Sequence, residues 1–281
     1  MTKIEVIKKY KNGISLYDLS KLYKTHYSNI KNILLEKNIK IRTKSEARRK
    51  YKIDENYFSN IDSIEKSYLF GFLMADGFNY IYKKNKSRSI KIEIQTRDIE
   101  ILNLFKKELK TNYKIRKSKI FNKKLNKNYE SIILEINNKK MSEDLEQLGM
   151  LQNKSLILKF PNINKNYIWH FIRGYFDGDG SLSVFKRTKR ETCRGECYIL
   201  SSLAFCKTLK NILKKELNID SYIYKPGSIY SLKISSQISI FKFMKKIYEN
   251  SENGLRLERK YKKFIQFIKL VKIKGDCYAD N

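Results

Sequence analysis

The sequence predicts an α+β protein of two pseudo-symmetric αββαββα subdomains preceded by a small all-α module. Three observations support this fold class. One nine-residue pattern occurs twice, at 69–77 and 172–180, about a hundred residues apart, which is the spacing of a repeated domain and not of short stacked repeats. The same order of helical and strand patterns follows each copy. Three short helical patterns precede the first copy.

The N-terminal module is predicted to span 1–45. Apolar residues from Ile4 to Tyr10 mark the first helix, Ser15 can cap the second, and the third ends near Lys37. The trio resembles a helix-turn-helix module of the resolvase or transposase type, which implies DNA contact at the start of the third helix. The alternative is a helical extension that packs on the main domain. The candidate contact residues are Tyr27, Ser28, Asn29 and Lys31.

A basic segment follows this module, and we predict a linker over 46–62. Residues 40–52 hold seven basic side chains and one acidic one, Glu46. Such a run can be a solvated linker, or it can follow DNA phosphates or enter a minor groove. We interpret it as a DNA-contacting linker, with Arg42, Arg48 and Arg49 as its candidate contacts.

The first subdomain is predicted over 63–160 and the second over 161–281. Alternating apolar and polar residues predict strands, and apolar residues three and four apart predict helices. After the first motif we expect strands at 78–84 and 88–95, a helix at 98–110, strands at 113–120 and 129–137, and a helix at 139–148. After a motif helix at 167–178 we expect strands at 181–187 and 196–202, a helix at 205–217, strands at 220–225 and 228–234, and helices at 237–249 and through Leu270.

Small residues recur four apart in each motif, at Gly71 and Ala75 and at Gly174 and Gly178. Residues i and i+4 share a helix face, so each motif helix presents a smooth stripe. Glycine within a helix costs about 1 kcal/mol relative to alanine, and close contact with another backbone can offset this cost. We therefore predict that the two motif helices pack face to face and join the two subdomains.

An aspartate precedes the final glycine of each motif, at Asp76 and Asp179. A carboxylate in the last turn opposes the helix dipole, and two such carboxylates repel each other when the helices pair. A divalent cation between them reconciles both effects. Oxygen ligands favour Mg²⁺ or Mn²⁺, which can activate water for displacement at phosphorus. The alternative is that both aspartates only end their helices.

The paired motifs resemble those of the LAGLIDADG homing endonucleases in their single-chain, two-motif form. The resemblance covers about 60–270 and implies that Asp76 and Asp179 bind the catalytic metal. It also implies a basic residue near the catalytic centre, matched by Lys154 and Lys260, and a polar residue that positions water, matched by Gln95 with Ser201 or Ser202 as its looser counterpart. The first motif departs from the family pattern at Met74, where the second motif has Asp177. This position precedes the expected metal ligand, Asp76, so the departure does not affect it.

The outer faces of the two predicted sheets are the expected DNA-reading surfaces, because long polar side chains there can reach base edges in a major groove. Period-two alternation is what any half-exposed sheet shows, so the excess of charge is the informative feature. The candidate contacts are Tyr80, Tyr82, Lys84, Arg88, Lys91 and Glu93 in the first half, and Ser183, Phe185, Arg187, Tyr222, Tyr224 and Lys233 in the second.

The charge balance points to a polyanionic partner. The 281 residues include 60 Lys and Arg against 29 Asp and Glu, a net charge of +31. An AT-rich genome enriches lysine but does not deplete acidic residues, so nucleic acid is the leading candidate. No basic amphipathic anchor stands out, which argues against a membrane-surface role. We expect double-stranded DNA as the partner and a monomer as the working form.

Cysteine and histidine usage narrows the chemistry. Cys193, Cys197, Cys206 and Cys277 do not form two close pairs, and there are only two histidines, so a zinc site is poorly supported and reduced thiols are expected. The chain opens with no signal-peptide pattern and holds no membrane-spanning run. We therefore expect a soluble intracellular protein of the cytoplasm, nucleoid or an organelle.

The leading hypothesis is a site-specific, Mg²⁺-dependent double-strand DNA endonuclease that cuts a long asymmetric target, with Mn²⁺ able to substitute. The second is a catalytically silent nucleic-acid-binding protein on the same scaffold, either a transcription regulator or an intron RNA maturase. A recombinase would need a nucleophilic serine or tyrosine domain that the sequence does not contain.

Overall fold

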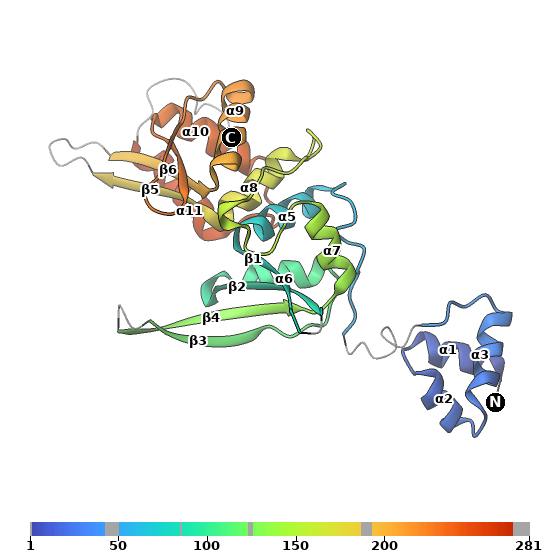
Figure 1. Ribbon diagram of the computed structural model, residues 1–281. Coiled ribbons are helices and arrows are strands. Elements are labelled where there is room, and N and C mark those ends of the chain that lie inside the picture. The colour runs from blue at the N-terminus through green and yellow to red at the C-terminus, as the bar shows by residue number, and fades with distance from the viewer. Residues whose placement is uncertain (1, 43–50, 85, 123–125, 187–192, 272–281) are drawn as a thin grey trace. The chain divides into compact units, whose positions relative to one another are not determined.

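The computed structural model describes residues 2–42, 51–84, 86–122, 126–186 and 193–271. The chain forms two compact units, Met1–Lys52 and Ile53–Asn281. Figure 1 shows the helices of the first unit and the two sheets of the second. Arg48, Arg49 and Arg187, three of the predicted DNA contacts, lie outside the described residues.

The first unit contains the three expected helices, α1 (Lys3–Lys11), α2 (Leu16–Leu22) and α3 (Tyr27–Glu36). Ser15 caps α2 by accepting the Asp18 backbone N–H at 3.1 Å. A four-residue turn joins α2 to α3. The core is formed by buried side chains that all three helices contribute: Val6, Tyr10, Leu19, Ile30, Ile33 and Leu34.

Arg42 completes this small unit. Its guanidinium donates to the backbone oxygens of Tyr10, Gly13 and Ile14, and it lies 4.3 Å from the centre of the Tyr10 ring. Its backbone N–H donates to the Tyr10 hydroxyl at 2.7 Å. Three carbonyls and a ring hold the guanidinium, so Arg42 belongs to the helical trio and not to a linker. Its contact with DNA stays a prediction.

The second unit has the predicted α+β architecture, with two four-stranded antiparallel sheets in the orders β1-β2-β4-β3 and β5-β6-β8-β7. The first half comprises α5 (Ile64–Asp76), β1 (Gly77–Ile81), β2 (Arg88–Gln95), α6 (Ile99–Glu108), β3 (Arg116–Asn122), β4 (Lys127–Ile136) and α7 (Lys139–Gln147). The second comprises α8 (Ile168–Asp179), β5 (Gly180–Lys186), β6 (Cys193–Ser201), α9 (Leu203–Leu217), β7 (Tyr222–Tyr224), β8 (Tyr230–Ile234), α10 (Gln237–Tyr248) and α11 (Glu258–Val271).

The two sheets share one register. Gly77 pairs with Ile92 in the first, and Gly180 pairs with Ile199 at the same place in the second. Alternate residues of the inner strands are buried under the helices, as Ile90 and Ile92 are on β2. Among the described residues, no helix covers the other face of either sheet, and this face carries exposed rings and charges. This pairing of a helix-covered face with an open face explains the alternation in the sequence.

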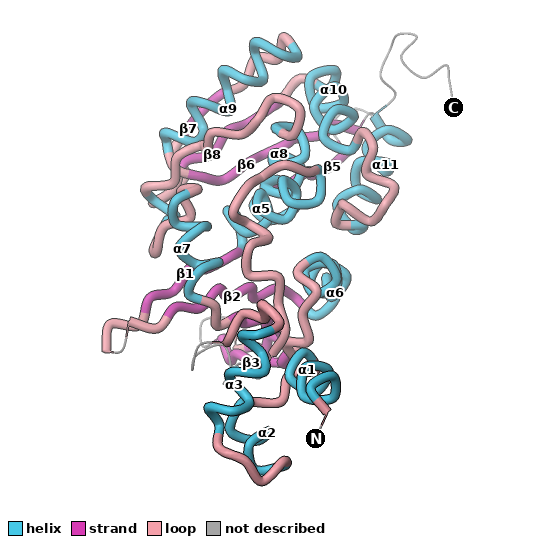
Figure 2. The backbone as a smooth tube through the Cα atoms, turned by 90° about the vertical axis from the view of Figure 1, so that its right-hand side faces the viewer, coloured by secondary structure: helices cyan, strands magenta, loops and turns pink. Residues whose placement is uncertain are grey.

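The motif helices α5 and α8 pack against each other along their small residues and lie side by side in both views (Figures 1 and 2). A Cβ on Gly71 would overlap the backbone oxygen of Phe171, and a Cβ on Gly174 would overlap that of Tyr68. A Cβ on Gly178 would overlap the Cβ of Ala75. The predicted face-to-face packing is therefore confirmed, and it places the C-terminal ends of both helices together.

The glycine that ends each motif is required for space. Gly77 and Gly180 have extended backbones, with φ of −85° and −84°, so any residue could adopt their conformation. A Cβ on Gly77 would lie 2.6 Å from the Leu73 backbone oxygen, and one on Gly180 would overlap the Phe176 ring. Each glycine lets a strand begin directly against the helix that it leaves.

Candidate active site

The two motif aspartates lie in one cleft. Asp76 is the last residue of α5 and Asp179 the last of α8. Both side chains line a cleft of about 340 Å³ at the junction of the two halves. The cleft is lined by residues of both halves: Met74, Ala75, Asp76, Phe78, Glu93, Lys154, Ser155, Leu158, Tyr175, Asp179 and Ile229.

Burial and proximity raise the pKa of both carboxyls. Burial is the largest cause for Asp179, whose pKa rises to about 6, and the charge of Asp76 raises it further. The pKa of Asp76 also rises because of its burial. Lys154 and Lys260 oppose the rise at each carboxyl. Two carboxylates that repel each other within a cationic surround favour a ligand of positive charge between them.

Each aspartate has a buried lysine behind it. Lys154 donates to the backbone oxygens of Ala75, at 3.2 Å, and Gly77. Lys260 donates to those of Gly178 and Gly180 at 2.9 and 2.7 Å. The pattern is the same in both halves, since each lysine bonds the residue before and the residue after its aspartate.

The lysines donate hydrogen bonds to carbonyls at the C-terminal ends of α5 and α8. A positive charge is favourable there, because the C-terminal end of a helix dipole is negative. Burial lowers the pKa of both ammonium groups to about 8. The charges of Asp76 and Asp179 oppose this decrease in the pKa of each lysine and favour the protonated form. The sequence context therefore identified two lysines that the structure brings to equivalent places.

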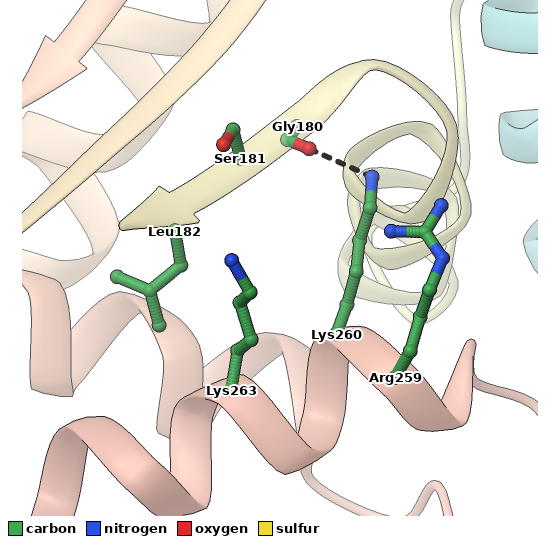
Figure 3. A pocket seen from close by; sticks show the side chains of 6 residues that line it. All are labelled: Gly180, Ser181, Leu182, Arg259, Lys260 and Lys263. Atoms are coloured by element: carbon green, nitrogen blue, oxygen red, sulfur yellow. Dashed lines mark hydrogen bonds between the residues drawn. The ribbon is translucent and has the colours of Figure 1, made fainter. Parts of the chain in front are cut away.

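A second, smaller pocket of about 70 Å³ lies beside Lys260 at the start of β5 (Figure 3). Arg259, Lys260 and Lys263 of α11 contribute three cations to it. The dashed line marks the bond from the Lys260 ammonium to the Gly180 backbone oxygen. The Arg259 Nε–H donates to both oxygens of Asp98, at 2.7 and 3.0 Å, which links the second half to the first beside the cleft.

A buried carboxylate lies directly beneath this arrangement. Asp177 accepts hydrogen bonds from the hydroxyls of Tyr68 and Tyr248, each at 2.9 Å, and from the Leu257 backbone N–H at 2.7 Å. Tyr68 belongs to α5 of the first half, and Leu257 lies three residues before Lys260. Asp177 therefore links both halves to the segment that carries Lys260. The first half has buried Met74 at the equivalent position, a side chain that cannot form such a network.

The residues present fit a divalent cation that prefers oxygen ligands. Asp76 and Asp179 supply carboxylate oxygens at one cleft. The raised pKa of each carboxyl shows that its charged form is disfavoured without a cation. Among the described residues, no group of three or more His, Cys, Asp or Glu side chains is arranged so that it could hold a metal ion. Further ligands would thus come from water, backbone oxygens or substrate phosphate, which is how Mg²⁺ is commonly bound.

Gln95 is not among the residues that line the cleft. It is exposed at the end of β2, where it pairs with Ser131 of β4. Glu93, two residues earlier on the same face of the strand, does line it. By register the counterpart of Gln95 is Ser202, which is buried and caps α9. On this strand, the polar side chain that lines the cleft is therefore Glu93 and not Gln95.

The open face of the first sheet carries most of the predicted contacts. Tyr80 and Tyr82 are in edge contact at 4.6 Å between ring centres, and Lys91 pairs with Glu93 at 2.7 Å. Arg88 lies on the other face. Its guanidinium pairs with Glu146 at 2.5 Å and with Glu143 at 3.9 Å, both on helix α7. The prediction of Arg88 as part of the open surface is wrong, because it points the same way as Ile90.

The open face of the second sheet carries Tyr222, Tyr224 and Phe185, all exposed. Lys233 lies on this face too, where its ammonium pairs with Glu196 at 2.8 Å and lies 5.2 Å from the centre of the Tyr198 ring. In the separate N-terminal unit, Tyr27, Asn29 and Lys31 are exposed on α3, and the Ser28 hydroxyl lies 2.8 Å from the His26 Nδ1.

Tyr175 is a cleft residue that sequence reasoning missed. Its hydroxyl donates to the Ser201 Oγ at 2.8 Å, and its ring stacks on Phe205 at 4.2 Å. A signal was available, since Tyr175 lies four residues before Asp179 and therefore on the same helix face. Arg259 and Asp98 were missed for a different reason: they are 161 residues apart, and no local pattern relates them.

The described cysteines Cys193, Cys197 and Cys206 are free thiols. Burial raises the pKa of the Cys206 thiol to about 11, which makes it a poor nucleophile at neutral pH. Among the described helices, none has the length and apolar character needed to cross a bilayer.

The fold and the site define a class: a pseudo-symmetric α+β protein in which two helix-terminal carboxylates meet where the halves join. Comparison with known families agrees with this class: residues 166–248 match the family model of the LAGLIDADG-like domain. No curated protein matches the sequence.

Three solved structures share the fold. The homing endonuclease I-WcaI bound to its DNA recognition sequence matches with a TM-score of 0.54 and 17% identity, over 78% of this chain and 92% of that chain. The LAGLIDADG homing endonuclease I-GzeII in complex with DNA target matches with a TM-score of 0.51 and 12% identity, over 72% of this chain and 88% of that chain. The I-SmaMI LAGLIDADG homing endonuclease bound to cleaved DNA matches with a TM-score of 0.50 and 15% identity, over 72% of this chain and 87% of that chain. The resemblance seen in the motifs is thus confirmed: the chain has the LAGLIDADG homing endonuclease fold and contains a LAGLIDADG-like domain.

Proposed function

We propose that this protein is a site-specific DNA endonuclease that hydrolyses one phosphodiester bond on each strand of a long duplex target. One observation carries the proposal. Two buried carboxylates, Asp76 and Asp179, end paired helices at a single cleft, and a buried lysine stands behind each. A protein that only bound nucleic acid would have no use for two adjacent carboxylates that repel the phosphates.

Asp76 and Asp179 would hold Mg²⁺, with Mn²⁺ as a substitute, through their carboxylate oxygens. When bound, the cation supplies an activated water and a positive charge opposite the reacting phosphate. The carboxylates themselves contribute placement, because α5 and α8 are packed too closely to shift independently. Two similar half-sites in one chain would serve the two strands of a duplex.

Lys154 and Lys260 have two roles in this proposal. Each holds the end of its motif helix through backbone oxygens, so the aspartate next to it stays in place. Each also adds a buried positive charge near the phosphate as negative charge develops there. In a site shielded from water such a charge stabilises a transition state more than it would in solution.

The open faces of the two sheets would lie in the major groove on either side of the cleft. Exposed Tyr80, Tyr82 and Lys91 in the first half and Tyr222, Tyr224 and Lys233 in the second can reach base edges or phosphates there. The unlike residues of the two faces favour an asymmetric target read by a monomer. In the same proposal, Tyr27, Ser28, Asn29 and Lys31 of the N-terminal module add contacts beyond that footprint, as a helix-turn-helix does.

The test uses the DNA that flanks this gene, joined in its uninterrupted form, incubated with the protein with and without Mg²⁺. We expect one discrete double-strand cut that requires the cation. Asp76→Asn and Asp179→Asn should each abolish double-strand cleavage while leaving duplex binding intact. Asp220→Asn is the matched control, because the Asp220 side chain is 77% exposed and lies in no pocket of the site.

Cleavage at the normal rate by either aspartate variant would refute the assigned site. Tight, salt-sensitive binding with no cut in Mg²⁺ or Mn²⁺ would instead support the catalytically silent alternative, a regulator or an RNA maturase. These outcomes separate the enzyme from a binding protein on the same scaffold.

A further inference from the structure

The helices that cover the two sheets differ sharply in charge. Helices α6 and α7 of the first half carry four lysines and five acidic residues. Their counterparts α9 and α10 carry seven lysines and one acidic residue. Each pair follows the same strands in its half and packs on the same face of its sheet.

This difference is not a product of lysine-rich composition. Both halves belong to one chain, so any bias of the coding sequence acts on both equally. The first half keeps its helical layer near neutrality, with Glu143 and Glu146 paired to Arg88 and Asp144 paired to Lys140. The second half concentrates positive charge on the equivalent surface. A concentration confined to one of two matched surfaces indicates a ligand for that surface.

The lysines of both helices are exposed to solvent. Lys207, Lys210 and Lys214 are exposed on one side of α9, at spacings of three and four residues. Lys242 and Lys245 are exposed on α10, which packs beside α9. Figure 2 shows both helices against the sheet β5–β8. We call these five residues the helix-face lysines.

Few acidic residues neutralise this surface. Lys214 pairs with Asp220 at 2.9 Å, and Lys246 of α10 pairs with Glu249 at 2.7 Å. Among the described residues, Lys207, Lys210 and Lys242 have no ion-pair partner within 4 Å. The surface therefore keeps a net positive charge after its internal pairs are counted.

We propose that the helix-face lysines bind the phosphate backbone of a second duplex DNA segment while the sheets hold the first. The proposal rests on the proposed function only in taking duplex DNA as the ligand of the open sheet faces. The helix face lies on the opposite side of the same sheet, behind a layer of helices about 10 Å thick. One straight duplex cannot touch both surfaces.

The spacing and chemistry fit a duplex backbone. Lys207 and Lys214 are seven residues apart, which is about 10 Å along a helix, and one strand of a duplex has about three phosphates over that length of the duplex axis. Binding to unpaired bases uses exposed aromatic rings as stacking platforms. The exposed large apolar side chains on α9 and α10 include Ile238 but no aromatic ring, whereas the open sheet face has Tyr222 and Tyr224. Lysines without rings favour phosphate contact over base stacking.

The experiment measures bridging between two duplexes. Wild-type protein is mixed with a biotinylated and a fluorescent 30-base-pair duplex in the presence of a chelator, so that no cleavage occurs, and fluorescence is measured after capture on streptavidin. The variant Lys207→Gln/Lys210→Gln/Lys242→Gln should reduce bridging at least tenfold at 0.1 M salt. The salt dependence of bridging should fall by about 2.7 in log–log slope, at about 0.9 for each lost phosphate contact.

The matched control is Lys106→Gln/Lys107→Gln/Lys139→Gln, which removes three charges from the first half's helical layer and should bridge like the wild type. Both variants should bind a single duplex and cleave it normally, because none of the substituted residues lines the cleft.

Unchanged bridging by the helix-face variant would overturn the proposal, as would an equal loss in the control variant. Preferential capture of a matched RNA over the second DNA duplex, lost in the same variant, would also overturn it by assigning the surface to RNA. Failure to bind any single duplex would refute the proposed function instead, so the two failures are distinguishable.

Discussion

Replacing Gly174 with alanine tests the helix packing that brings the two aspartates together. A Cβ at this position would overlap the backbone oxygen of Tyr68 and lie 2.9 Å from the backbone nitrogen of Phe72. Non-bonded heavy atoms in favourable contact are about 3.5 Å apart, so the Phe72 nitrogen alone would require a shift of ~0.6 Å, and the nearer Tyr68 oxygen requires a larger one. Backbone atoms cannot turn aside as a side-chain end can. The strain therefore extends along the whole α5–α8 contact.

The expected net cost follows from two opposing effects. Overpacking in a well-packed interior costs about 1–3 kcal/mol, and the upper end applies here because the obstructing atoms are backbone. Alanine regains about 1 kcal/mol through its higher helix propensity. We therefore expect Gly174→Ala to lower the free energy of unfolding by about 2 kcal/mol.

Urea unfolding of both the variant and the wild type gives this difference directly. Gly227→Ala is the matched control, because a Cβ on Gly227 would have no atom within 4 Å and its φ is not positive. It should change stability by less than about 0.5 kcal/mol. If Gly174→Ala were as stable as the wild type or more stable, the close packing of the motif helices would be refuted. Weaker cation binding in the folded variant would show that the helix spacing sets the distance between the aspartates.

Three further predictions concern the site. The pKa of Asp179 is raised from 3.8 to about 6, so the folded chain binds that proton more tightly than the unfolded chain does. Without a cation, the free energy of unfolding should therefore fall as pH rises from about 4 to about 6. The thermal stabilisation by Mg²⁺ should grow over the same pH range. Asp177→Asn should cost about 2 kcal/mol in urea unfolding, because an amide cannot accept all three of the hydrogen bonds that the carboxylate accepts. Lys260→Met should lower the cleavage rate about 100-fold or more, whereas Lys262→Met, at an exposed position of the same helix, should retain most of it. Equal rates for the two variants would contradict the role of Lys260.

The sequence predicts the architecture well because the small residues of the motif indicate how closely two helix backbones approach each other. Small residues four apart on a helix have few uses other than close packing, so Gly71 and Gly174 are enough to indicate a helix pair. The final glycines were less transparent. A glycine after a helical pattern ordinarily indicates a helix stop. Gly77 and Gly180 do follow the last residue of each helix, but their backbones are extended and the requirement is for space against Leu73 and Phe176.

The individual contacts were harder to predict, for reasons that differ from residue to residue. Arg88 could have been assigned correctly, since it is two residues before Ile90 and so faces the same helices. Arg42 could not, because its carbonyl partners lie about 30 residues earlier in a turn whose shape is not encoded locally. Lys154 and Lys260 were found by context, but their binding of helix-terminal carbonyls is seen only in the folded chain, where each lysine lies against the end of its motif helix.

The polar contacts between the halves explain why the second half cannot be treated as a copy of the first. Tyr68 of α5 donates to Asp177, which also holds the segment leading to Lys260, and Arg259 next to that lysine reaches across to Asp98. The first half thus contributes a hydroxyl and a carboxylate to the support of the second half's lysine. Among the described residues, the hydrogen-bond and ring partners of Lys154 all belong to the first half. The second half-site therefore depends on the first for its geometry, and a change in Tyr68 or Asp98 should disturb Lys260 more than Lys154.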